Sequence, residues 1–169
     1  VERASPSKRV AAGVSTLAAD RDHGAMQLAA GAVDVLRGEA ADRKQEAVGD
    51  ADAALDSATD AAYTLAAARP AMWPLASALA RVLDAARRER PVSAGDAWRA
   101  VEAAALAELN RATADAASLA GACAAVVESA VAAAPGKPIV SLSYSSSVVA
   151  GLTRAAAAAL AASRPPLPV

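Results

Sequence analysis

The residues with the clearest chemical potential lie near the end of the chain, where serines follow a short apolar run. Residues 137–152 read KPIVSLSYSSSVVAGL. Ile139, Val140 and Leu142 are typical of a buried strand, and the serines after them are typical of a helix start. A strand that enters a helix through small residues exposes backbone N–H groups, which together with hydroxyl donors can form an anion site. The alternative interpretation is that the serines only cap the helix.

Two isolated side chains are the other candidates for chemistry. His23 stands beside Asp20 and Asp22 and could act as an acid or base, or simply form hydrogen bonds in a loop. Cys123 lies among alanines at helical spacing, which favours a small packing residue over a nucleophile. One histidine and one cysteine cannot form a Cys/His zinc cluster, and a single cysteine excludes an intrachain disulfide. We therefore expect no metal, no cofactor and a reducing compartment.

The composition predicts long helices that pack closely. The chain is 55% hydrophobic but has no Phe and only 2% aromatic residues, because alanine dominates the apolar fraction. Each alanine buries little surface, so stability must come from many close contacts between helices. The 17 basic residues are interspersed with 18 acidic ones, for a net charge of -1. This pattern gives no nucleic-acid footprint, and no direct nucleic-acid partner is expected.

Helical spacing and turn residues together predict most of the elements. Gly38 is expected to weaken the second helix, and Gly121 to separate a long helix from a shorter one that ends before Pro135. The predicted helices cover about residues 6–19, from Asp22 to about Gly38, from Asp50 or Asp52 to about Ala68, from about Pro74 to Arg90, from Asp96 onward, and from one of Ser145, Ser146 or Ser147 toward the C-terminus.

Three segments, taken in order, resemble a known family. They read DRDHGAMQLAAGAVDVLR, ARPAMWPLASALARVL and AAVVESAVAAAPGKPIVSLSYSSSVVAGL. Their order and spacing resemble those of the alpha, beta and delta subunits of translation initiation factor 2B and the related methylthioribose-1-phosphate and ribose-1,5-bisphosphate isomerases. The strand and turn IVSLSYSSSVV are the most specific part of this resemblance.

The resemblance implies a mainly α fold with the start of an α/β domain. Residues 1–136 would form an N-terminal helical domain with a long connecting helix. Residues 137–169 would be the first strand and helix of a truncated, Rossmann-like domain, with the strand at residues 139–143. Such proteins form homo- or hetero-oligomers through that domain, so association with other chains is expected.

The resemblance also implies a ligand site between the two domains. Arg21 and Arg69 would direct guanidinium groups at a sugar phosphate or nucleotide, since arginine offers bidentate donors with a permanent charge. His23 and Gly24 belong to the same loop as Arg21, and the serine turn would add donors from Ser143, Ser145 and Ser146. The alternatives are that Arg69 caps the third helix and that Arg21 is solvated.

Departures from the family pattern favour a binding function over catalysis. The isomerases carry a cysteine in the serine turn, where this chain has Ser143 and Tyr144. Their acidic catalytic partner lies in a region that this chain does not contain. We therefore expect a noncatalytic regulatory or assembly protein, with an aldose-ketose isomerase of phosphorylated pentoses as the alternative. A purely structural helical scaffold is the third interpretation.

Apolar runs such as AAAAALAA are too short to cross a bilayer, and the first residues carry no signal-type apolar core. We expect a cytoplasmic protein without a membrane partner.

Overall fold

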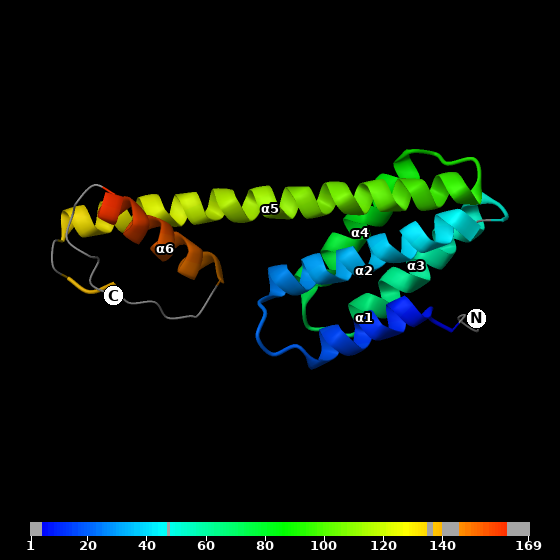
Figure 1. The fold of residues 1–169 in the computed structure, drawn as a ribbon, viewed down its shortest axis with the longest axis horizontal. Coiled ribbons are helices and arrows are strands. Elements are labelled where there is room, and N and C mark those ends of the chain that lie inside the picture. The colour runs from blue at the N-terminus through cyan, green and yellow to red at the C-terminus, as the bar shows by residue number, and fades with distance from the viewer. Residues whose placement is uncertain (1–4, 47, 135–136, 140–145, 162–169) are drawn as a thin grey trace. The chain divides into compact units, whose positions relative to one another are not determined.

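The computed structural model describes residues 5–46, 48–134, 137–139 and 146–161, and its regular structure is helical (Figure 1). The chain divides into two compact units, Val1–Ala112 and Thr113–Val169. The helix α5 contributes its first part to one unit and its second part to the other. The helices of the described residues are α1 (Lys8–Ala19), α2 (Ala25–Glu46), α3 (Ala51–Ala67), α4 (Trp73–Arg88), α5 (Ala94–Ala133) and α6 (Ser146–Ala161).

The first unit is a helical bundle around one aliphatic core (Figure 1). Helix α2 packs against α1, α3 and α4, and α3 also packs against α1 and α4. The side chains of Leu36, Leu65 and Leu75 are fully buried, and Trp98 places the first part of α5 in the same core. Most other core positions are alanine, as the composition predicted. The bundle therefore buries its apolar surface through many small contacts.

Side-chain caps begin three of these helices where the sequence changes from loop to helical spacing. The Ser7 hydroxyl accepts a hydrogen bond from the Val10 N–H at 3.2 Å, one turn into α1. Asp50 accepts one from the Ala53 N–H at 2.7 Å, so of the two predicted helix starts, Asp50 and Asp52, it is Asp50 that caps α3. Ser93 caps α5 in the same way. These bonds satisfy N–H groups that a helix start otherwise leaves unpaired.

Two glycines that were expected to interrupt helices lie inside them. Helix α2 continues past Gly38 to Glu46, and α5 continues through Gly121. At Gly38, an added Cβ would lie 2.8 Å from Arg9 Nη1, so the missing side chain makes room for Arg9. Arg9 in turn forms an ion pair with Asp42 at 2.8 Å. The helix continues here although glycine in a helix costs about 1 kcal/mol relative to alanine.

The second unit contains the later part of α5 and the whole of α6. Ala120, Ala124 and Ala155 are buried in it. The contact is closest at Gly151, where an added Cβ would lie 2.4 Å from the Cβ of Cys123. Cys123 is a partly buried free thiol, which agrees with its interpretation as a packing residue.

Helix α5 also contains an apolar segment long enough to cross a membrane, and only 6% of that segment is buried. The continuous helix joins apolar runs that are short when read separately in the sequence. A single helix of this kind is weak evidence for a membrane location.

The predicted Rossmann-like strand–helix unit is wrong for the part of the chain that the structure describes, which contains its helix, α6, but no strand. Ile139 is described and lies outside any regular element, and no strand occurs among the described residues. Residues 140–143 of the predicted strand lie outside them. A strand needs a neighbouring strand to pair its backbone N–H and C=O groups, and the described residues supply none. The described residues therefore contain no sheet through which chains could associate in the way that the resemblance implies.

The domain boundary predicted after residue 136 stays a prediction, because residues 135, 136 and 140–145 lie outside the described residues. The final helix was expected to begin at one of the serines 145–147. It does, since α6 begins at Ser146.

The closest approach of α1 to α2 predicts a difference between two glycines. An alanine Cβ at Gly13 would lie 2.7 Å from Val35 Cγ1, whereas one at Gly31 would lie 3.8 Å from Leu17. We expect Gly13→Ala to lower the free energy of unfolding by about 1–3 kcal/mol through overpacking. Gly31→Ala should raise it by about 0.5–1 kcal/mol through helix propensity. Urea unfolding followed by circular dichroism measures both, and equal effects would contradict this packing.

The contact between α5 and α6 predicts the reactivity of the thiol. Gly151→Val places a branched side chain against Cys123, so α6 must move away. We expect alkylation of Cys123 by iodoacetamide to become several-fold faster in this variant. Gly121→Val is the control, because an added Cβ at Gly121 meets only the end of Arg154, at 3.6 Å. An unchanged alkylation rate in Gly151→Val would mean that α6 does not cover the thiol.

Candidate functional site: the loop between α1 and α2

The structure gathers four of the predicted site residues in the first unit. Arg21, His23 and Gly24 form the loop between α1 and α2, and Arg69 reaches the same loop from the end of α3. The remaining predicted residues are serines. Ser143 and Ser145 lie outside the described residues, and Ser146 is described only as the first residue of α6.

Asp20 organises the loop. Its carboxylate accepts hydrogen bonds from the backbone N–H groups of Asp22 and His23, each at 3.0 Å. The same carboxylate lies 2.8 Å from His23 Nδ1. The pKa of Asp20 is lowered, first by the backbone N–H of His23 and then by its imidazole. Asp20 therefore holds the imidazole in one orientation while the His23 side chain stays 55% exposed.

Arg69 binds the carbonyl end of α1. Its Nε donates to the Leu17 carbonyl oxygen at 2.9 Å, and its Nη2 donates to the carbonyl oxygen of Asp20. These bonds satisfy carbonyl groups that the last turn of a helix leaves unpaired, and the positive charge complements the helix dipole. One of the two interpretations of the sequence was that Arg69 caps α3. Its side chain instead caps α1. It fixes the loop through contacts 52 and 49 residues away in sequence.

Helix α2 begins directly after this loop. Gly24 accepts the first helical hydrogen bond from the Leu28 N–H at 3.0 Å, and its own N–H donates to the Gln27 side chain. The helix start predicted at Asp22 is therefore wrong, because Asp22 donates its N–H to Asp20 and remains in the loop. The N–H groups of Ala25 and Met26 belong to the first turn, where an α-helix provides no internal acceptor.

The arrangement offers several donors to an anion. The first turn of α2 supplies backbone N–H groups and the positive end of a dipole. Arg21 is exposed, and no hydrogen bond of its side chain is found among the described residues. The carboxylates of Asp20 and Asp22 oppose an anion, although Asp20 already accepts three hydrogen bonds. Recognition here would depend on the direction of donors more than on net charge.

A second polar centre, which was not predicted from the sequence, lies at Glu108 on α5. Its side chain is buried, with Arg81 Nη2 at 2.6 Å and Arg111 Nη2 at 2.7 Å from Oε1. Arg111 lies one turn after Glu108, and this spacing was visible in the sequence. The contact with Arg81 spans 27 residues and requires the fold. The pair ties α4 to α5.

The two arginines keep Glu108 ionised. Burial alone would raise the pKa of Glu108, but hydrogen bonds from Arg111 and Arg81 outweigh it and lower the pKa from 4.5 to about 2. Half-exposed guanidinium groups around a buried carboxylate can remain solvated on their outer sides.

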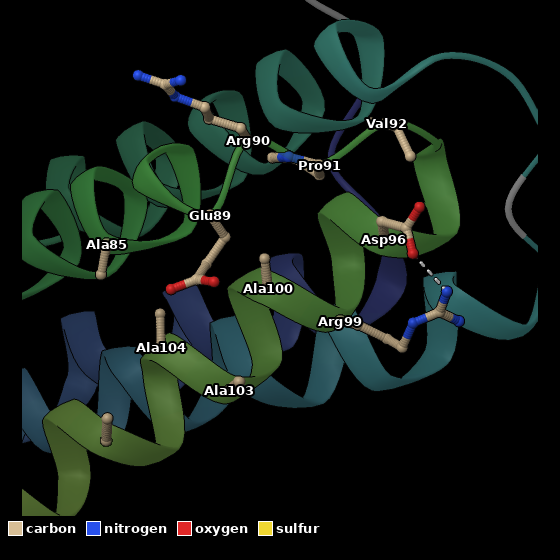
Figure 2. Close-up of a pocket in the computed structure, with 11 residues that line it drawn as sticks. Ala85, Glu89, Arg90, Pro91, Val92, Asp96, Arg99, Ala100, Ala103 and Ala104 are labelled. Carbon is tan, nitrogen blue, oxygen red and sulfur yellow. Dashed lines mark hydrogen bonds and ion pairs between the residues drawn. The ribbon is translucent and has the colours of Figure 1, made fainter.

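A groove in the first unit has a different character from these two polar centres. It has a volume of about 680 Å³ and lies between the end of α4 and the start of α5. Figure 2 shows the Glu89 carboxylate directed toward Ala100 and Ala104 of α5, while Arg90 points away from the cavity. Asp96 pairs with Arg99 at 2.7 Å and with the Ser93 hydroxyl that caps α5. The groove includes none of the predicted site residues, and its charged residues Asp96 and Arg99 already serve the start of α5.

Among the described residues, no group of three or more His, Cys, Asp or Glu side chains is placed to hold a metal ion.

Comparison with known proteins gives no relative for this chain. No protein-family model, no curated protein and no solved structure matches it. The resemblance to the initiation factor 2B subunits and the related isomerases therefore stays a prediction from the sequence.

The buried Glu108 predicts a pH-dependent stability. Its folded-state pKa is below 4.5, so its stabilisation is fully present above about pH 4.5 and is lost as the pH falls toward 2. We expect Glu108→Gln to lower the free energy of unfolding by about 1–3 kcal/mol near pH 7, and by less near pH 3. Urea unfolding at both pH values measures the difference.

The control for this prediction is Asp34→Asn, which removes an exposed ion pair with Arg37. Exposed pairs contribute little, so its effect should stay within about 0.5 kcal/mol at either pH. A Glu108→Gln effect that is equally small, or independent of pH, would contradict the assignment.

Proposed function

We propose that the chain is a noncatalytic regulatory or assembly protein that recognises a phosphorylated small molecule, a sugar phosphate or a nucleotide, at the loop between α1 and α2. The observation that carries this proposal is the placement of Arg69. Its bonds to Leu17 and Asp20 bring a guanidinium group to the loop that holds Arg21 and His23. The resemblance to initiation factor 2B regulatory subunits that the sequence motifs predict points to the same residues. The proposal needs the first unit alone.

The chemistry of the loop suits a phosphate group. Arginine provides planar, charged donors that match phosphate oxygens, and a helix N-terminus adds directed backbone N–H groups. Arg69 donates two hydrogen bonds to carbonyl oxygens. It therefore holds the loop in place and also adds positive charge to it. The Arg21 side chain has no hydrogen bond among the described residues, so Arg21 is the residue best placed to contact a ligand.

Isothermal titration with ribose 1,5-bisphosphate, methylthioribose 1-phosphate, AMP and GMP tests the proposal. We expect saturable binding of at least one of them, weakened about tenfold by Arg21→Ala, since a hydrogen bond to a charged group contributes about 1.5 kcal/mol. Arg69→Ala should weaken binding further, and also lower stability. Arg99→Ala is the matched control, because Arg99 is an exposed arginine in the groove of Figure 2.

Binding that survives Arg21→Ala and Arg69→Ala unchanged would place the ligand elsewhere. No heat with any of the four compounds would refute recognition of these phosphates and favour a structural scaffold.

A second candidate function is an aldose-ketose isomerase, and one contact favours it. His23 Nδ1 lies 2.8 Å from Asp20 Oδ2, so the carboxylate orients an exposed imidazole that could move a proton. Turnover of ribose 1,5-bisphosphate that is lost in His23→Gln but retained in Arg99→Ala would establish this function. Binding without turnover would support the noncatalytic one.

A further inference from the structure

A small cavity lies among three helices of the first unit, separate from the groove of Figure 2. It has a volume of about 270 Å³. Met26, Ala29, Ala30 and Val33 of α2 form one wall, and α4 and α5 form the others. Trp73 stands at the first turn of α4 and is 78% exposed. A large exposed aromatic ring beside an apolar wall is typical of a site that contacts a ligand.

The other end of the cavity is polar. Arg81, Ser77, Glu108 and Arg111 line it, with Arg81 about 12 Å along α4 from Trp73 at a rise of about 1.5 Å per residue. This end is thus lined by two guanidinium groups and one carboxylate. The cavity therefore has an apolar body and an end lined with charged side chains.

Arg81 retains donors for a ligand. Its Nε and Nη2 donate to Glu108, and its Nη1 donates to Ser77 Oγ at 2.9 Å. Within the described part of the chain these bonds use three of the five N–H groups of a guanidinium, so one N–H remains on each Nη. The Arg81 side chain is 47% exposed, and Glu108 fixes its orientation. Two donors on neighbouring nitrogens match the two oxygens of a carboxylate.

We propose that this cavity binds a small organic monocarboxylate with a flat or short apolar body. The carboxylate pairs with the two remaining N–H groups of Arg81. The apolar body covers Ala30 and Val33 and reaches toward Trp73. This site shares only Met26 with the phosphate loop and its following helix start, and it does not rest on the function proposed for that loop.

The test uses 4-fluorobenzoate as the probe, with fluorine NMR as the measurement, and the whole chain as the protein. The uncharged 4-fluorobenzamide has nearly the same shape and serves as the chemical control. We expect saturable binding of the acid, and binding of the amide about tenfold weaker because it lacks the charge. AMP should not displace the acid, since Arg21, His23 and Arg69 do not line the cavity.

Two variants locate the binding. Ala30→Leu fills the apolar wall from a helical position that is only partly buried, so the bundle should fold, and it should weaken binding at least tenfold. Ala103→Leu places the same side chain in the groove of Figure 2 and should leave binding unchanged. Arg81→Gln should reduce the preference for acid over amide toward equality, while the amide still binds.

Equal binding of acid and amide to the wild type would overturn the proposal, because Arg81 would then recognise no charge. Equal weakening by Ala30→Leu and Ala103→Leu, or no saturable binding of the acid at millimolar concentration, would also overturn it.

Discussion

The fold depends on helices that approach closely enough for alanine to make a core. No large aromatic layer separates the helices, and Trp98 is the single buried aromatic side chain among the described residues. At two positions even alanine would be too large, since Gly13 and Gly151 lie where a Cβ would overlap a neighbouring side chain. Leucine and valine fill the remaining space. The fully buried alanines of the first unit include Ala32, Ala40, Ala58, Ala86 and Ala105.

The sequence could predict the elements that local residues determine, but not those that depend on packing between distant segments. Proline and capping residues act locally, so the starts of α1, α3 and α4 could be placed within a few residues. The interruptions expected at Gly38 and Gly121 did not occur, and at Gly38 the missing side chain makes room for Arg9 of another helix, which the local sequence does not reveal. The predicted strand failed for a related reason. A run of branched residues indicates a strand only if another strand lies beside it, and local sequence does not reveal that partner.

The candidate sites show the same division between local and distant information. The loop at residues 21–24 could be selected from its residue types and from a resemblance, and Arg69 with it. The carbonyl groups that Arg69 binds could not be foreseen, since they lie on another helix. Glu108 and Arg81 were missed because charged residues on helix faces are usually solvated. Only the fold reveals that α5 turns Glu108 inward and that α4 supplies a second arginine.

The two tryptophans give this protein an unusual optical asymmetry. Trp98 is buried in the core of the first unit, whereas Trp73 is already exposed, so the change of emission on unfolding should come from Trp98 alone. Residues 113–169 contain no tryptophan. Fluorescence therefore reports the first unit, while far-ultraviolet circular dichroism sums the helices of both. A gap between the two melting curves would measure how independently the units unfold.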